Sequence, residues 1–202
     1  MMLGALLSVL NFVGIISFSI SGSLKAFEKR LDLLGVLVLG FSTALAGGII
    51  RDVMLGVFPP SNLRTISYPL LAILGSFLTI VFHKYIENLT KALLIADAIG
   101  LGTFTAIGSE IAVEHNLNVI GVAIISSVTA VGGGVIRDLL SNEIPIVLRK
   151  DFYATPTILG GLLFYPVYYV LGSGYSVLWT FVFVSTLRLI AIFRKWELPK
   201  VG

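Results

Sequence analysis

The hydrophobic residues of this chain fall into long runs separated by short polar breaks. A helix needs about 20 mostly apolar residues to cross a bilayer, and seven runs approach or exceed that length. We expect helices at about 3–24, 33–56, 66–86, 91–112, 118–141, 155–172 and 175–193. The pattern leaves no stretch for a soluble domain, so we expect residues 1–202 to form a single membrane domain. The predicted fold class is an all-α membrane protein with seven transmembrane helices.

The composition agrees with this pattern. Of the 202 residues, 56% are hydrophobic and only 12% are charged, whereas a soluble domain of this length exposes much more charge. The chain has no cysteine, which excludes disulfides, thiolate metal sites and cysteine nucleophiles. The apolar start of the chain contains no lysine or arginine before Lys25, so we expect a retained transmembrane helix there and not a signal peptide.

Basic residues occur in alternate loops between the predicted helices. They follow the first, third, fifth and seventh apolar runs: Lys25, Lys29, Arg30, Lys84, Lys91, Arg149, Lys150, Arg194, Lys195 and Lys200. The opposite side carries only Arg64. Because basic loops stay in the cytoplasm, we expect a multi-pass protein of the cell membrane with its N-terminus outside and its C-terminus cytoplasmic. This topology explains the net charge of +3, so we expect no nucleic-acid partner.

A six-residue motif occurs twice. The sequence GGIIRD at 47–52 returns as GGVIRD at 133–138, which is an offset of 86 positions. The same offset aligns many further residues: Gly14 with Gly100, Phe18 with Phe104, Gly22 with Gly108, Thr43 with Thr129 and Pro59 with Pro145. With a slip of one residue, it also aligns Tyr68 with Tyr153. The chain therefore contains two repeats, at about 3–86 and 91–172, and an extra helix at about 175–193.

Each repeat contains three predicted helices. Since three is odd, the second copy enters the membrane upside down relative to the first, which is the plan of inverted repeats. In such folds the solute site lies near the midplane, where discontinuous helices of the two halves meet. Here we expect the discontinuous helices to be 33–56 and 118–141.

Glycines and charges lie together at probable membrane depth in both motifs. Glycine pairs loosen a helix and free its carbonyl groups, and charge inside a membrane is costly unless it is functional. We therefore expect a cation pathway, with hydroxyls one turn before the glycines on the same route. Its predicted residues are Thr43, Gly47, Gly48, Thr129, Gly132, Gly133 and Gly134. The alternative is that the glycines only allow helices to pack closely.

The arginine and aspartate of each motif are adjacent in sequence. Neighbours on a helix point about 100° apart and pair poorly with each other. We therefore expect a crossed arrangement, with Arg51 on Asp138 or a carbonyl and Arg137 on Asp52. The alternative is that each arginine reaches the membrane surface from its helix end.

Further polar residues interrupt the apolar runs. Asn11 and Asp97 occupy matching positions in the two repeats, and an acid within a membrane helix is by default a functional candidate. A cap or packing hydrogen bond is the alternative. Ser17 and Ser21 lie four residues apart and share a helix face, so we include both in the pathway. The alternative is that these hydroxyls bond back to their own helix. Arg188 either neutralises an acid or anchors the last helix at the inner surface.

Two acids lie near the outer end of the fourth predicted helix. Glu110 and Glu114 either attract cations to a pore mouth or form a solvated face. We expect no bound metal beyond transient potassium or sodium at the glycine breaks, because His83 and His115 have no second ligand nearby.

Enzyme motifs are missing from the sequence. There is no HExxH or GxSxG pattern, and the glycine-rich motifs lack the lysine of a phosphate loop. Asp52 and Asp138 each follow an arginine, which keeps an acid ionised, whereas an aspartyl protease needs one neutral acid. We therefore expect a protein that is not an enzyme and has no cofactor.

The doubled motif and the two three-helix repeats resemble the prokaryotic trimeric intracellular cation (TRIC) channels. Bacterial members of this family are also described as predicted glycine transporters. The resemblance implies a homotrimer in a lipid bilayer. It also implies a pore inside each protomer, lined by kinked helices 2 and 5, and passive permeation of potassium and sodium. Helix 2 departs from helix 5 in having Ala46 where helix 5 has Gly132. One alternative function is a secondary carrier or exporter of a small amino acid such as glycine. Another is a non-transporting scaffold or lipid-binding protein.

Overall fold

The computed structural model describes residues 2–149 and 152–196. Lys150 and Lys200, two of the basic residues that predict the orientation, lie outside the described residues. The described part is helical, with short connections. In chain order the helices are α1 (Met2–Glu28), α2 (Leu33–Met54), α3 (Ser61–Arg64), α4 (Ser67–Phe82), the 3-10 helix η1 (His83–Tyr85), α5 (Leu89–Glu114), α6 (Val119–Leu140), α7 (Ile146–Arg149), α8 (Thr155–Leu171) and α9 (Ser173–Arg194).

Each of the seven predicted apolar runs forms a helix. Six of them are long and apolar enough to cross a membrane, and α8 is a shorter apolar helix of 17 residues. Helix α8 has Pro156 in its first turn, where proline is tolerated. It ends before Gly172, whose φ of +81° breaks the helical conformation. The short helices α3 and α7 were not predicted.

The starts of α2 and α6 use matching caps. The Asp32 carboxylate accepts a hydrogen bond from the Gly35 amide at 2.7 Å, and the Asn118 side chain accepts one from the Gly121 amide at 2.9 Å. Such side chains satisfy amide groups that have no partner within the helix. Because Asp32 and Asn118 are also 86 positions apart, the repeat extends to the local signals that start its helices.

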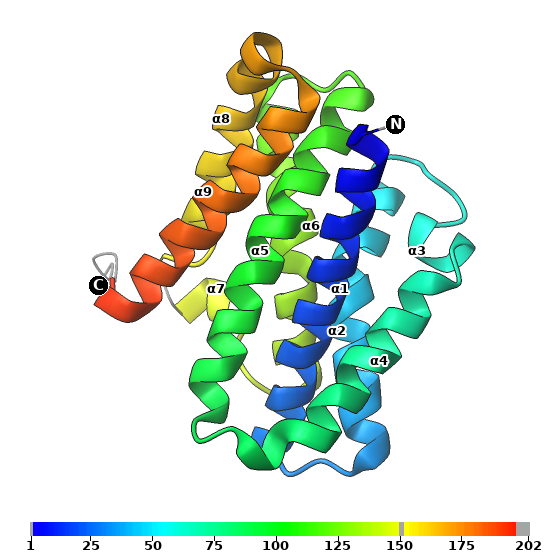
Figure 1. Ribbon diagram of the computed structural model, residues 1–202, viewed down its shortest axis with the longest axis vertical. Coiled ribbons are helices and arrows are strands. Elements are labelled where there is room, and N and C mark those ends of the chain that lie inside the picture. The colour runs from blue at the N-terminus through cyan, green and yellow to red at the C-terminus, as the bar shows by residue number, and fades with distance from the viewer. Residues whose placement is uncertain (1, 150–151, 197–202) are drawn as a thin grey trace.

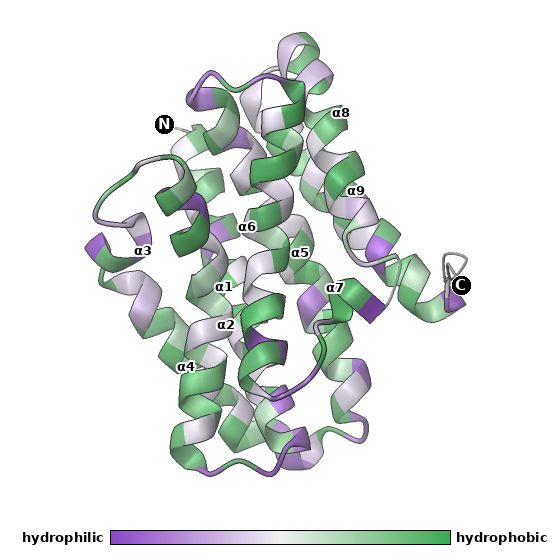
Figure 2. Ribbon diagram, turned by 180° about the vertical axis from the view of Figure 1, so that it is seen from behind, coloured by the Kyte–Doolittle hydropathy of each residue, from purple (hydrophilic) through white to green (hydrophobic). Residues whose placement is uncertain are grey.

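The helices form a bundle with α5 at its centre (Figure 1). In its most apolar stretch, α5 has 72% of its residues buried, whereas α4 has 22% and lies at the outside of the bundle. Helices α2 and α6 run in opposite directions and cross (Figures 1 and 2). The N-terminus lies at the same end of the bundle as the α8–α9 turn (Figure 1).

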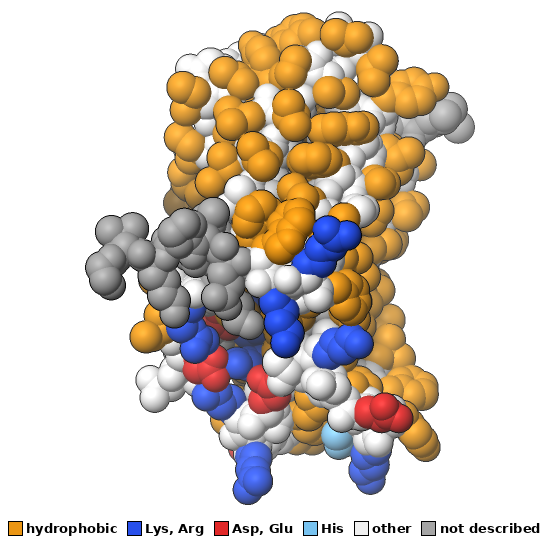
Figure 3. Space-filling view, turned by 90° about the vertical axis from the view of Figure 1, so that its left-hand side faces the viewer, with side chains coloured by type: hydrophobic (Ala, Val, Ile, Leu, Met, Phe, Trp, Pro, Cys, Tyr) orange, Lys and Arg blue, Asp and Glu red, His pale blue; other side chains and the backbone are white. Residues whose placement is uncertain are grey.

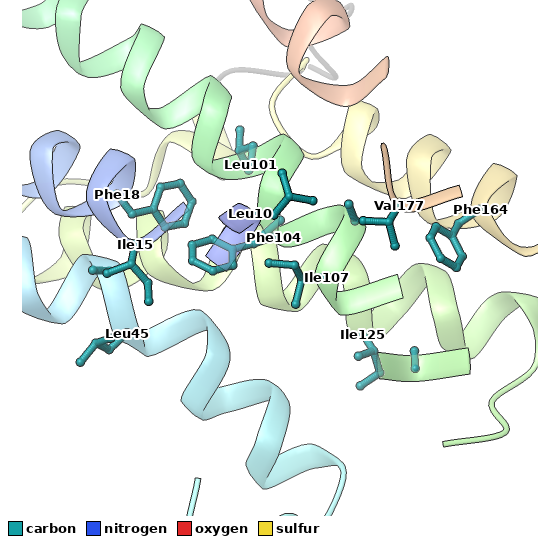
Figure 4. Packing of buried hydrophobic residues seen from close by; sticks show 14 of the residues in the cluster. Leu10, Ile15, Phe18, Leu45, Leu101, Phe104, Ile107, Ile125, Phe164 and Val177 are labelled. Atoms are coloured by element: carbon teal, nitrogen blue, oxygen red, sulfur yellow. The ribbon is translucent and has the colours of Figure 1, made fainter. Parts of the chain in front are cut away.

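The hydrophobic core is centred on equivalent residues of the two repeats. Phe18 of α1 and Phe104 of α5 pack with ring centroids 5.1 Å apart, and Leu10, Ile15 and Leu101 lie around them (Figure 4). The two repeats therefore share one hydrophobic core.

Charged side chains gather at one end of the bundle. On the face shown in Figure 3, lysines and arginines lie in the lower part, while the upper part is hydrophobic. At this end Glu143 is paired with Lys25 at 2.9 Å, Lys29 at 2.8 Å and Arg149 at 3.0 Å. This network joins the end of α1 to the segment that follows α6.

Candidate functional site

The glycines of the two motifs lie where α2 crosses α6. A Cβ atom at Gly47 would overlap the carbonyl oxygen of Thr129, and a Cβ atom at Gly133 would overlap the carbonyl oxygen of Thr43. Both helices remain α-helical through these glycines. The expected breaks with free carbonyls are therefore wrong: the missing side chains are needed for close helix contact, which is the common use of small residues in membranes.

The threonine hydroxyls at the crossing are bonded within their own helices. Thr43 donates to the carbonyl of Leu39, and Thr129 donates to the carbonyl of Ile125, each at 2.6 Å. Both threonines are fully buried. Each hydroxyl donor is thus already used, although each oxygen can still accept a hydrogen bond.

Each arginine pairs with the aspartate of its own motif. Arg51 Nη2 lies 2.7 Å from Asp52 Oδ1, and Arg137 Nε lies 2.9 Å from Asp138 Oδ1. The crossed arrangement is therefore wrong. Although the Cβ atoms of adjacent helix residues point in different directions, the long arginine side chain curls back to the neighbouring carboxylate.

The antiparallel crossing of α2 and α6 is a second reason why the arginine of one motif does not reach the aspartate of the other. From the contact between Gly47 and Gly133, α2 continues toward one end of the bundle and α6 toward the other (Figure 1). Arg51 and Arg137 each lie one turn beyond the crossing, so they diverge. With a rise of about 1.5 Å per residue, the two pairs are about 12 Å apart along the helix axes.

Both aspartates also hold the start of the next short helix. Asp52 Oδ2 accepts from the Ser61 amide at 2.6 Å, and Asp138 Oδ2 accepts from the Ile146 amide at 2.7 Å. Ser61 opens α3 and Ile146 opens α7. Each Arg–Asp pair therefore fixes the chain that follows its transmembrane helix.

Arg137 is the centre of a larger cluster. Its Nη1 atom donates to Asp97 Oδ1 at 2.5 Å and to the Ser21 hydroxyl at 2.7 Å. The Tyr153 hydroxyl also donates to Asp97 Oδ1, at 3.2 Å. All four side chains are buried. The structure thus brings together Asp97, Ser21, Arg137 and Asp138, four of the predicted site residues.

Arg188 completes this cluster from α9. Its guanidinium lies 4.8 Å from the centre of the Tyr153 ring, a cation–π distance, and its Nη1 donates to the Phe152 carbonyl at 3.0 Å. Only 3% of Arg188 is exposed, so it does not anchor at the membrane surface. Sequence reasoning missed the role of Tyr153, although its alignment with Tyr68 marked the position.

The matching residues of the first repeat do not gather around Arg51. Asn11, the equivalent of Asp97, is half-buried and makes no side-chain hydrogen bond with the described residues. Ser17 is buried without a hydrogen bond to Arg51 in the described part of the chain. Near Gly48, the Asn62 amide donates to the carbonyl of Leu45 at 3.0 Å.

Several buried polar atoms in the Arg137 cluster have no hydrogen-bond partner among the described residues. They are Asp97 Oδ2, Arg137 Nη2, Arg188 Nε and the hydroxyl of Ser185 nearby on α9. Buried polar groups are normally paired with protein atoms or water. The cluster therefore has free hydrogen-bonding capacity for water or a small ion. The described residues contain no group of three or more His, Asp or Glu side chains that could hold a metal ion.

Comparison with known proteins identifies the family. A family model described as "Glycine transporter" matches residues 8–84 and 94–169, two stretches whose starts are 86 residues apart. A solved TRIC cation channel is 46% identical over 96% of this chain and 97% of its own, with a TM-score of 0.88. The chain belongs to the prokaryotic TRIC family.

Further similar proteins also match nearly the whole chain. A prokaryotic TRIC channel crystallised in 0.5 M KCl is 41% identical over 95% of this chain and 98% of its own, with a TM-score of 0.90. The inner membrane protein YadS of Escherichia coli K12 is 38% identical over 94% of this chain and 92% of its own length. The membrane protein YvgT of Bacillus subtilis is 33% identical over 95% of this chain and 94% of its own length. The protein is therefore a multi-pass membrane protein with the TRIC fold, and its solved relatives are channels rather than enzymes.

Proposed function

We propose that this protein is a channel for monovalent cations, potassium and sodium. The observation that carries the proposal is the similarity to TRIC cation channels, at 41% and 46% identity over nearly the whole chain. The buried cluster around Arg137 supports it, because a transport path needs polar groups that can exchange partners with a passing ion.

The proposed path runs inside one protomer, along α2 and α6. The path has two polar sites, the pair of Arg51 with Asp52 and the cluster of Arg137, Asp97 and Asp138. The glycine crossing lies between these two sites, so we take the crossing as the constriction of the path. Each arginine is neutralised by its aspartate, which reduces the repulsion of cations.

We further propose that the repeats are inverted. The contact of Gly47 with Thr129 and that of Gly133 with Thr43 exchange equivalent residues, as a two-fold axis requires. The charged end of the bundle then faces the cytoplasm, with the N-terminus outside. Homotrimer assembly rests on the Rhodobacter sphaeroides relative, which is described as a trimeric intracellular cation channel and has a TM-score of 0.89 at 28% identity.

Single-channel recording tests the function. Purified protein is inserted in planar bilayers between unequal potassium chloride solutions. The expected result is discrete current steps that reverse near the potassium equilibrium potential. If the bilayers stay silent while vesicles holding the same protein exchange labelled glycine, the protein is a carrier, the function that the name of the matching family model suggests.

Neutralising the aspartates tests the path. Asp52→Asn and Asp138→Asn should each lower the unitary potassium conductance, because each leaves an arginine charge uncompensated. Glu87→Gln is the matched control, since Glu87 is exposed in the connection before α5. Unchanged conductance in both aspartate variants would move the path away from the motifs while leaving the channel function intact.

A further inference from the structure

A cavity of about 530 Å³ lies at the end of the bundle that holds the N-terminus and the α8–α9 turn. It is formed between the first turns of α1 and the start of α9, and its walls are mostly apolar. The lining includes Leu3, Leu6, Leu171, Ser173, Tyr175 and Leu178. Tyr175 and Leu178 are exposed, so the cavity opens at the outer surface of the bundle.

A buried carboxyl group adjoins this cavity. Ser173, which lines the cavity, lies with its hydroxyl 2.5 Å from Glu110 Oε1. Glu110 is 1% exposed, and its second oxygen, Oε2, has no hydrogen-bond partner among the described residues. No basic side chain of the described residues forms an ion pair with Glu110. The serine is thus shared between the cavity and a buried acid that lacks a counter-charge.

The fold does not need an acid at this position. The equivalent residue of the first repeat, 86 positions earlier, is Leu24, which is fully buried. A leucine fills the same place in the bundle, and burial of an uncompensated carboxylate is costly. The acid at position 110 therefore calls for an explanation beyond packing, which a cationic ligand provides.

We propose that this cavity binds a phospholipid whose head group carries a primary ammonium. The ammonium lies at Ser173, attracted by the Glu110 carboxylate behind that serine, and an acyl chain lies against the leucines of α1, α8 and α9. Because the Ser173 hydroxyl already donates to Glu110, its oxygen can accept a hydrogen bond from a primary ammonium, whereas a choline head group has no N–H donor. An anionic head group would be repelled by the carboxylate. The inference concerns lipid binding and does not rest on the proposed channel function.

Native mass spectrometry tests the proposal. The purified protein is incubated with equal amounts of phosphatidylethanolamine, phosphatidylcholine and phosphatidylglycerol in detergent, and bound lipid is counted per protomer. We expect wild type to retain phosphatidylethanolamine at least fivefold over the other two lipids. Glu110→Gln should abolish this preference. Glu114→Gln is the matched control, because Glu114 is an exposed carboxylate one turn further along α5, and it should behave as wild type.

A second variant keeps the test decisive if Glu110→Gln fails to fold. Leu178→Trp leaves the acid in place and fills the cavity from its lipid-facing side, so it should lower phosphatidylethanolamine retention at least fivefold. Equal retention of the three lipids by wild type would overturn the proposal. Wild-type preference in folded Glu110→Gln protein would do the same.

Discussion

The two copies of the Arg–Asp motif share a backbone plan but differ in their surroundings. Arg51 is bonded to Asp52 alone among the described side chains. Arg137 is bonded to Asp138, Asp97 and Ser21, and it is completely buried. Two exchanges between the repeats contribute to this difference: Asn11 stands where the second copy has Asp97, and Ile107 stands where the first copy has Ser21.

The extra acid of the second copy is balanced from outside the repeat. Asp97 and Asp138 carry two negative charges, and Arg137 and Arg188 carry two positive ones. Arg188 comes from α9, which has no counterpart in either repeat. The comparison teaches that two copies of one motif can differ in buried charge where a helix outside the repeats supplies a compensating arginine.

The largest expected effect is loss of Arg137. In Arg137→Met, Asp97 and Asp138 are left buried without their main counter-charge, and breaking a buried pair in this way costs about 3–5 kcal/mol. In Arg51→Met only Asp52 loses its partner and it keeps the Ser61 amide, so we expect about 1–3 kcal/mol. Unfolding by SDS in mixed micelles measures both. Equal losses would show that the extra partners of Arg137 contribute nothing to stability.

Substitution of the two crossing glycines should lower stability by equal amounts, whereas substitution of the two arginines should not. Gly47→Ala and Gly133→Ala each place a methyl group on a backbone carbonyl of the other helix, and such overpacking costs about 1–3 kcal/mol. We expect equal losses of thermal stability in detergent. Gly4→Ala is the control, because nothing lies within 4 Å of a Cβ atom there. A clear difference between the two crossing variants would mean that the asymmetry extends to the crossing itself.

The balance of charge is tested by a double-mutant cycle. Asp97→Asn and Arg188→Gln each leave one uncompensated charge near Tyr153, whereas the double variant restores neutrality. The coupling free energy should therefore be favourable by about 0.5–3 kcal/mol. Additive losses of stability in SDS titrations would show that Arg188 is held by Tyr153 and the Phe152 carbonyl alone.

The smallest effect concerns Glu143, in the basic end of the bundle. Hydrogen bonds from Lys29 and Lys25 hold the pKa of Glu143 at about 2, below its ordinary value of 4.5. The stabilisation is therefore complete above about pH 4.5 and is lost as the pH falls toward 2. Because the pairs are partly exposed, we expect less than about 1 kcal/mol for each.

Melting temperatures of wild type and Glu143→Gln from pH 2 to pH 7 check this dependence. The two proteins should differ at neutral pH and converge in acid. The position 86 residues earlier is Val57, so no such network exists at the matching point of the first repeat. A difference in melting temperature that stays constant over the whole pH range would show that the charge of Glu143 does not stabilise the fold.

Sequence reasoning predicted the seven apolar helices and the repeat, because both depend on local patterns. Hydrophobic runs place the helices, and Asp32 and Asn118 start two of them with the same cap. The partners of Arg51 and Arg137 depend instead on the relative direction of the helices and on the conformation of the arginine side chains. Neither can be predicted from a local sequence pattern. The tight crossing at Gly47 shows the same limit, since one glycine pair suits a broken helix and a close contact equally well.

The partners of Arg137 also set the order in which this protein can be assembled. Ser21 is synthesised 116 residues before Arg137, whereas Arg188 follows it by 51 residues. During translation, Gly47 can meet Thr129 only after α6 has been synthesised. Helices α1 and α2 therefore spend part of translation without α5 and α6, against which they pack in the finished structure. The Arg137 cluster can close only after α9 has been synthesised, because Arg188 belongs to that helix.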